Sequence, residues 1–328
     1  MPTLSELRLK RQARSSESHV PQGYFKKQVI LEFLKLTAAT MQKYCGLAIL
    51  LVVILQQGCS AEFWDDFRIT YNINAFGHFN RLPRTIRDAS FAQQGWLATS
   101  ANCSNDGNFN GIQHIIPGDY SAALLFDVNG VIAGIQQLLN KSSILGPDNG
   151  VNYPALPVYQ SITFENQEYF LLTSYFVDPA TICTTGRSDS DLVTDGTGTS
   201  LWIQNGTSPS TSIQVPKNRT EAIAEGWTKN QCFIGMGSHN FYQVEQYTSN
   251  NCTEMFPAFG LYNREDALMG FGFITPGTVI NHRFENPPNA AIRLILGETP
   301  ECVTDTNDRI GLTSMHTYFV DTPWLIIC

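Results

Sequence analysis

Short runs of apolar residues, broken by turn-forming segments, recur along the chain after residue 61. The clearest case is residues 121–136, in which two apolar runs flank the turn Asp-Val-Asn-Gly at residues 127–130. Asn-Gly is the strongest short signal for a turn between antiparallel strands, so this segment predicts a β-hairpin. Similar patterns predict strands at residues 62–83, 159–164, 169–177, 201–203, 212–215, 233–246, 257–273, 290–296 and 312–325.

The same patterns predict only two helices, both short. Residues 85–94 begin with Thr85 and have Asp88 three positions later, which resembles a capping box, and Gly95 is placed to end the helix. A second helix is expected at residues 220–225. No long amphipathic pattern follows residue 61, so the predicted fold class is all-β or β-dominated α+β.

Several landmarks occur twice and in the same order. Tyr-Phe-Val-Asp at residues 175–178 precedes Cys183, and the same four residues at 318–321 precede Cys328. The hairpin pattern of residues 121–136 also returns, without gaps, further along the chain at residues 257–272. We therefore expect two tandem homologous units, each a small antiparallel sheet structure with one short helix.

The expected domain order follows from these landmarks and from shifts in composition. A linker is placed where Gly, Ser, Thr and Asp accumulate without apolar periodicity. The segments are a basic N-terminal extension at residues 1–40, a signal peptide at 41–61, a first β-rich unit at 62–183, a linker at 184–199 and a second β-rich unit at 200–328.

An export signal is predicted before the first unit. The apolar run at residues 45–55 is shorter than the roughly 20 residues needed to span a bilayer, and small residues follow at 59–61. This pattern predicts a signal peptide cleaved after Ala61, with either Met1 or Met41 as the true start. The expected protein is secreted and extracellular. The alternative is an uncleaved signal anchor, which would make it a single-pass type II membrane protein.

Composition after residue 61 agrees with export. Before residue 62 the chain has 8 of its 21 Lys and Arg residues and 3 of its 29 Asp and Glu residues. Residues 62–328 therefore carry 13 basic and 26 acidic side chains, a net charge of −13. Such a charge repels phosphate backbones and excludes nucleic acid as a partner, while a membrane is expected only for the anchor. Sequons for N-glycosylation begin at Asn102, Asn140, Asn205, Asn218 and Asn251.

The six cysteines after residue 61 are an even number, as an oxidising compartment predicts. If equivalent cysteines of the two units do equivalent jobs, each unit has one bridge, and one further pair remains in the second unit. Each bridge closes a loop of about 50 to 100 residues, which stabilises the fold by about 4 kcal/mol in the chain-entropy model. The expected pairs are Cys103–Cys183, Cys232–Cys328 and Cys252–Cys302.

Two histidines of the second unit are the candidate catalytic or metal-binding residues. His239 lies beside two glycines, and His316 is specific to the second unit because Thr173 occupies its place in the first. One hypothesis is that both lie on neighbouring strands and, with Glu265 or Asp266, bind a metal ion or act as acid and base. The alternative is that each is a hydrogen-bonded histidine within a sheet.

Two polar segments carry the oxygen ligands that Ca²⁺ prefers, although neither has the EF-hand spacing. The alternative is that both are solvated turns. Ca²⁺ and Zn²⁺ are the only metals that the sequence suggests, and no other cofactor is predicted. The residues concerned are Asp189, Asp191 and Asp195 in the linker, and Asp106, Asn108 and Asn110 after Cys103.

Our first functional hypothesis is a secreted, disulfide-bonded N-glycoprotein of two homologous β-rich units with a binding or structural role outside the cell. Its ligand would be a protein, a small molecule or a glycan. The alternative is an extracellular enzyme, metal-dependent or not, whose site lies in the second unit. The chain has no Gly-x-Ser-x-Gly motif and uses its cysteines in bridges, which favours the non-enzymatic hypothesis.

Overall fold

The computed structural model describes residues 63–71, 79–100, 103, 107–146, 149–244 and 252–328. Contacts divide the chain into one unit of residues 1–60 and another of residues 61–328. The described residues all belong to the second unit, so the expected extension and signal peptide lie outside them. Within the described ranges, every helix is too short or too polar to cross a membrane.

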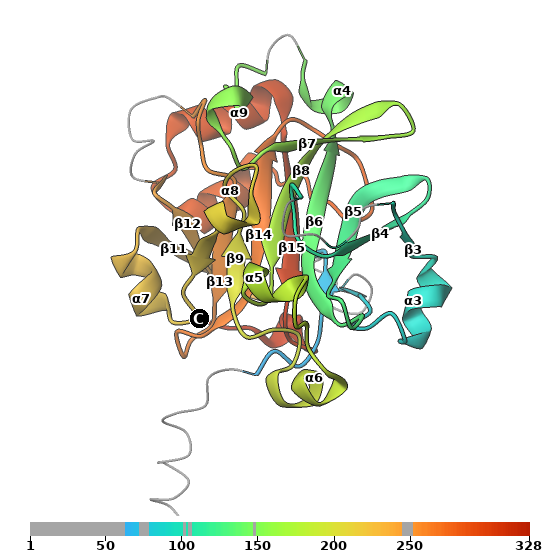
Figure 1. Ribbon diagram of the computed structural model, residues 1–328. Helices are drawn as coiled ribbons and strands as arrows, with labels where there is room; N and C mark the ends of the chain where they lie inside the picture. The colour runs from blue at the N-terminus through green and yellow to red at the C-terminus, as the bar shows by residue number, and fades with distance from the viewer. Residues whose placement is uncertain (1–62, 72–78, 101–102, 104–106, 147–148, 245–251) are drawn as a thin grey trace, which may run out of the picture. The chain divides into compact units, whose positions relative to one another are not determined.

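The described residues form two antiparallel sheets (Figure 1). The first sheet has the order β10-β9-β8-β6-β5-β4-β3, and β7 pairs with β8 outside this path. Its strands are β3 (Leu97–Ala98), β4 (Ile112–Ile116), β5 (Asp119–Phe126), β6 (Ile132–Asn140), β7 (Gln160–Phe164), β8 (Gln167–Tyr175), β9 (Leu201–Ile203) and β10 (Ile213–Val215).

The second sheet has the order β11-β12-β13-β14-β15-β1-β2. Its strands are β1 (Arg68–Ile69), β2 (Asn80–Arg81), β11 (Trp227–Phe233), β12 (Gly237–Tyr242), β13 (Ala258–Tyr262), β14 (Leu268–Pro276) and β15 (Leu312–Tyr318). Both predicted hairpins are present, as β5–β6 and as β13–β14. The β-dominated fold class is therefore confirmed.

Helices are short and lie between the strands. Gly95, at a φ of 80°, ends the first of them as expected. They are α3 (Ala89–Gln94), α4 (Lys141–Ile144), α5 (Pro179–Ile182), α6 (Asp189–Asp195), α7 (Arg219–Ala224), α8 (Asn289–Leu296) and α9 (Glu301–Ile310). Single 3₁₀ turns occur at Tyr153–Ala155, Pro209–Thr211 and Pro323–Leu325.

The strand predicted at residues 290–296 is wrong, because this segment is helix α8. Pro288 at the N-cap and Gly297 at the C-cap are helix boundary signals, and the apolar residues between them have helical spacing. The ten-residue helix α9 was also not predicted. Both helices lie in the connection from β14 to β15.

The two sheets share one strand order over five strands: β3-β4-β5-β6-β8 in the first corresponds to β11-β12-β13-β14-β15 in the second. In each sheet a glycine faces a tyrosine, since Gly134 lies opposite Tyr175 and Gly270 lies opposite Tyr318. A β-carbon at either glycine would lie 2.3 Å from a carbonyl oxygen of the facing strand. Only glycine fits this close approach of two backbones.

The edge strands do not follow the expected unit boundaries. β1, from the range 62–83 expected in the first unit, pairs with β15 and carries β2 into the second sheet. β9, expected to open the second unit, pairs with β8 and carries β10 into the first sheet. Residues 184–199, expected as a linker, contain α6. Each sheet is thus completed by strands from outside its own expected unit.

One hydrophobic core lies between the sheets, as in a sandwich. Phe126 of β5 and Phe271 of β14 are both fully buried in it. Phe176 and Phe319, the residues that follow β8 and β15, meet in this core with ring centroids 5.1 Å apart. Trp64 stacks on Phe319 at 4.0 Å, which fixes the N-terminal strand segment to the same core.

Three disulfides are formed, with Cα–Cα distances of 5.2, 5.7 and 5.8 Å that suit an ordinary bridge. Such a set is typical of proteins that fold in an oxidising compartment. The pairs are those expected from the repeated landmarks: Cys103–Cys183, Cys232–Cys328 and Cys252–Cys302.

The glycine registers can be tested by adding a methyl group. Gly270→Ala and Gly134→Ala should each lower the free energy of unfolding by about 2 kcal/mol or more, because the new β-carbon meets a backbone oxygen. Gly146→Ala is the control, since a β-carbon there meets nothing within 4 Å and should change stability by less than about 0.5 kcal/mol. Urea unfolding measures all three, and a Gly270→Ala protein of wild-type stability would contradict the register.

Candidate functional site

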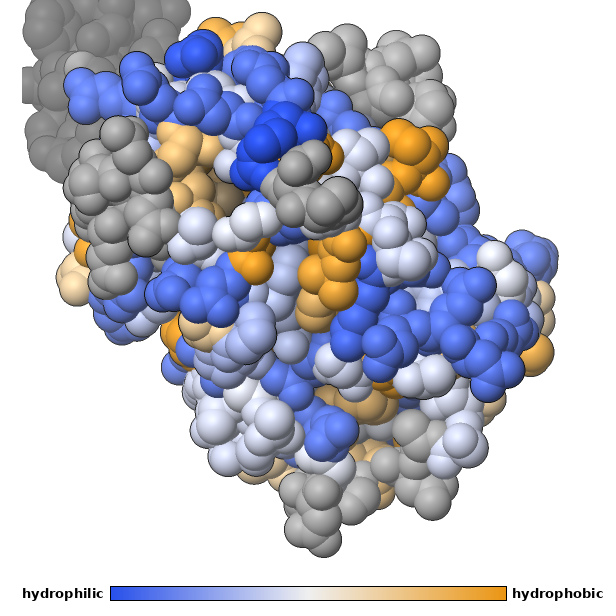
Figure 2. Space-filling view, turned by 90° about the horizontal axis from the view of Figure 1, so that it is seen from above, coloured by the Kyte–Doolittle hydropathy of each residue, from blue (hydrophilic) through white to orange (hydrophobic). Residues whose placement is uncertain are grey.

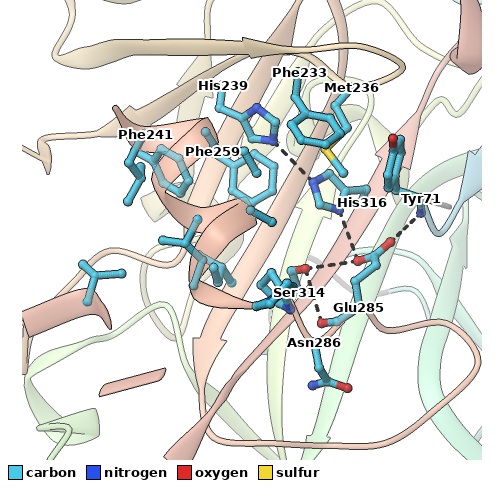
Figure 3. A pocket seen from close by; sticks show the side chains of 18 of the residues that line it. Tyr71, Phe233, Met236, His239, Phe241, Phe259, Glu285, Asn286, Ser314 and His316 are labelled. Carbon is cyan, nitrogen blue, oxygen red and sulfur yellow. Dashed lines mark hydrogen bonds and ion pairs between the residues drawn. The ribbon is translucent and has the colours of Figure 1, made fainter. Parts of the chain in front are cut away.

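A cavity of about 350 Å³ lies between the second sheet and helix α8 (Figure 3). The sheet contributes the face that points away from the shared core, and α8 and α9 cover it. The lining is mainly aliphatic and aromatic, with a polar group at one side. Its apolar side chains include Phe241, Phe259 and Ile274 from the sheet and Ile292, Ile295 and Leu296 from α8.

Strand alternation decides which side chains reach this cavity. Met315 of β15 faces the shared core, whereas its neighbours Ser314 and His316 face the cavity. On β12 the alternating residues His239 and Phe241 face it. The outer face of the second sheet is therefore the functional candidate, while its inner face holds the fold together.

Helix α8 presents a continuous apolar stripe to the sheet. Ile295 and Leu296 lie three and four positions after Ile292, so the three side chains share one face of the helix. The bridge Cys252–Cys302 joins the segment before β13 to α9, beside the same apolar cluster. This bridge therefore helps to hold the helical cover on the sheet.

His239 and His316 are brought together at the polar side of the cavity. Their Nε2 atoms lie 3.5 Å apart. The prediction that their strands are neighbours is wrong. The two histidines lie on β12 and β15, and β13 and β14 lie between these strands. The contact spans this gap over Gly272 of β14, where a β-carbon would lie 2.3 Å from the ring of Phe259. Glycine at this position leaves room for rings above the sheet.

The acidic partner of the histidine pair is Glu285, which the sequence did not indicate. Its carboxylate accepts hydrogen bonds from His316 Nδ1 at 3.1 Å, from Ser314 Oγ at 3.1 Å and from the Tyr71 backbone N–H (Figure 3). Backbone hydrogen bonds in both directions tie Glu285 to Ser314 at 2.8 and 2.9 Å. The carboxylate is therefore fixed in place behind His316.

The expected acidic partners lie elsewhere. Asp266 forms an ion pair with Arg219 beside helix α7. Glu265 lines a different cavity, together with Asp65 and Asp321. No spacing rule would have selected Glu285, because it precedes α8 and approaches His316 only through the folded connection between β14 and β15.

Burial controls the protonation of this pair. Desolvation lowers the pKa of His239 well below its usual 6.5, and the neighbouring His316 lowers it further, while the backbone of Gly237 acts in the opposite direction. His239 is therefore neutral at physiological pH. Burial also raises the pKa of Tyr71, so its phenol stays protonated.

The arrangement supplies few ligands for a metal ion. Among the described residues, no group of three or more His, Cys, Asp and Glu side chains could hold one. The two histidines offer two nitrogens, and the oxygens of Glu285 are already engaged by three donors. Zinc sites in proteins use three or four protein ligands, so the pair suits hydrogen bonding or proton transfer better.

Several of the residues considered for Ca²⁺ take part in helix capping or in hydrogen bonds. Asp189 and Asp191 stand in the first turn of α6, and the Asp191 carboxylate completes a capping box with Ser188. Asp195 is the last residue of α6. The side chain of Asn110 donates to the Pro179 carbonyl at 2.8 Å, and the Asn108 carbonyl accepts from Gln204 at 2.6 Å. Asp106 lies outside the described residues.

No protein-family model matches this chain, and no curated protein or solved structure is significantly similar to it. The functional interpretation therefore depends on the cavity and on the side chains that line it.

The buried His239 predicts how stability changes with pH. Its folded pKa is below the unfolded value of about 6.5, so the unfolded chain binds more protons and the folded state loses stability as pH falls below 6.5. The loss is up to about 1.4 kcal/mol per pH unit. His239→Phe should flatten this decrease in urea unfolding series between about pH 7 and pH 5.

The control for this experiment is His282→Phe, because the His282 side chain is 62% exposed and does not line the cavity. This variant should keep the decrease in stability that His239 causes toward low pH. An identical slope in the His239→Phe protein and the wild type would show that His239 is not held neutral by the fold.

Proposed function

We propose that this protein is a secreted, disulfide-bonded binding protein that holds a small apolar molecule in the cavity beside His239 and His316. The cavity carries the proposal: its volume of about 350 Å³ falls in the range of about 300 to 1,000 Å³ that small-molecule sites occupy. Like such sites, it combines an apolar lining with a few converging polar groups.

The volume limits the size of the ligand. A water molecule takes up about 30 Å³ in the liquid, so a cavity of 350 Å³ accepts a molecule of about a dozen non-hydrogen atoms. Protein interiors are otherwise close-packed, and an unfilled apolar cavity forfeits packing contacts along its walls. A ligand of this size would restore those contacts, which gives binding a physical driving force.

Figure 2 views the described unit from the end that carries α4 and α9, and hydrophobic residues appear there in separate groups among polar ones. A protein that binds through a broad apolar surface would present one large continuous patch instead. The cavity under α8 is therefore a better candidate than this face for an apolar ligand.

The duplication of the two units is part of the same proposal. Five strands in one order, the two glycine–tyrosine registers and the position of Phe176 and Phe319 support it. The units differ in the connection before their last central strand, which holds α4 and β7 in the first sheet but α8 and α9 in the second. The cavity would then be an acquisition of the second unit.

Export is supported by the three disulfides and by the sequons. Asn218 is exposed, whereas Asn140 and Asn205 are half-buried, and Asn102 and Asn251 lie outside the described residues. Asn218 is therefore the described sequon best placed to receive a glycan. An uncleaved anchor would display the same folded unit at a cell surface.

A second candidate function is an extracellular enzyme in which Glu285 orients His316 as a general base, as their 3.1 Å hydrogen bond would allow. Binding is favoured because, among the side chains that the structure describes, none is positioned as a nucleophile for that base. The hydroxyl of Ser314 donates to Glu285, and therefore does not face the Nε2 atom of His316.

Filling the cavity should weaken binding. Ala291 of α8 lines the cavity, so Ala291→Phe should weaken the binding of naphthalene, a molecule of suitable size, at least about tenfold by steric exclusion. Ala290→Phe is the matched control, because Ala290 is exposed and does not line the cavity. Calorimetric titration measures both, and equal affinities of the two variants, or no binding to wild type, would contradict the proposal.

Glycosylation at Asn218 is tested in protein secreted from eukaryotic cells. Thr220→Ala destroys the sequon but keeps the Asn218 side chain, which caps α7 by accepting from the Thr220 N–H at 2.8 Å. This variant should migrate faster than wild type until both are treated with peptide N-glycosidase. Thr220→Ser keeps the sequon and should migrate like wild type, and equal mobility of all three proteins before treatment would exclude a glycan there.

A further inference from the structure

The polar side of the cavity has two imidazole nitrogens that face each other. The Nε2 atoms of His239 and His316 are 3.5 Å apart, which is longer than the usual 2.7 to 3.2 Å of a protein hydrogen bond. The direct contact between the rings is therefore weak, and both histidines line the cavity. They are available to a polar atom of a ligand.

Glu285 determines which of these nitrogens is an acceptor. Because the carboxylate accepts from His316 Nδ1, the matching imidazole tautomer has its hydrogen on Nδ1 and a lone pair on Nε2. The contact between the two Nε2 atoms is a hydrogen bond and needs one donor, so the complementary tautomer of His239 carries its hydrogen on Nε2, and its buried Nδ1 has no partner among the described residues. The pair thus offers one acceptor and one donor.

A hydroxyl group matches this arrangement. An oxygen atom at about 2.8 to 3.0 Å from both nitrogens fits over a pair that is 3.5 Å apart. It can donate to His316 and accept from His239 at the same time. We propose that the ligand is an apolar alcohol of about a dozen non-hydrogen atoms, bound by its hydroxyl between His239 and His316, an inference that rests on the proposed binding function.

Charged head groups fit this site less well. A carboxylate has only acceptors, so it would leave the lone pair of His316 unpaired, and it would lie close to the negative charge of Glu285. An ammonium group has only donors, and moving it into an apolar cavity costs desolvation free energy. The uncharged hydroxyl supplies one donor and accepts one hydrogen bond without that cost.

Matched ligands test the hydroxyl in the wild-type protein. 1-Decanol and 1-methoxynonane have the same number of non-hydrogen atoms, but the ether cannot donate to His316. Decanol should bind about tenfold more tightly, since one buried acceptor stays unpaired in the ether complex. Decylamine and decanoate should bind more weakly than decanol, as measured by calorimetric titration at pH 7.5.

Variants assign the two hydrogen bonds. His316→Phe should remove the preference for decanol over the ether, whereas His239→Phe should weaken both ligands by a similar factor and keep that preference. His282→Phe, outside the cavity, should change neither affinity. The wild-type comparison does not depend on whether a variant folds.

The results separate this inference from the binding function. If naphthalene binds but decanol and the ether bind equally, or if the amine or the carboxylate binds best, the alcohol is wrong and the cavity remains a ligand site. If naphthalene and the four decyl-sized ligands all fail to bind the wild-type protein, the proposed function itself is wrong.

Discussion

The meeting of Phe176 and Phe319 in the central core is the contact on which the rest of the structure depends. Phe176 directly follows β8 and Phe319 directly follows β15. Their rings pack edge to face, with centroids 5.1 Å apart. The carbonyl of Phe176 accepts from Thr199, which leads into β9, and that of Phe319 accepts from Asp66, which leads into β1. The side chains of these two residues therefore join the sheets, and their carbonyl groups bind the segments that lead into the edge strands.

Because the inner faces stabilise the fold, the outer face of the second sheet is free to serve another purpose. There, glycine in β14 and the rings of Phe259, His239 and His316 form a floor, and α8 forms a cover. The floor is rigid because its strands belong to the sandwich, and Glu285 fixes His316 from behind. The sheet and Glu285 therefore fix the histidine pair relative to the apolar lining of the cavity.

Sequence patterns were sufficient where the interaction is local or repeated. The hairpins follow from turn chemistry, and the recurring Tyr-Phe-Val-Asp segment led to the cysteine pairs. Strand pairing between distant segments could not be predicted from the sequence. The two-residue strand β1, for example, has no pattern that indicates β15 as its partner. The short apolar run at residues 290–296 was predicted to be a strand, but its spacing and the flanking Pro288 and Gly297 are those of a helix. The approach of Glu285 to His316 arises only from the path of the chain.

The pairing of β1 with β15 also determines the order in which the molecule can be completed. The strands of the first sheet all lie between residues 97 and 215, so that sheet can assemble while the chain is still being synthesised. The second sheet is complete only when Arg68 meets Tyr318, a closure across 250 residues. Long-range pairings of this kind form slowly, and the aromatic segment around Trp64 stays without its partner until the end. A chain that stops before residue 319 therefore lacks the ring on which Trp64 stacks and leaves apolar surface exposed, as aggregation-prone folding intermediates do.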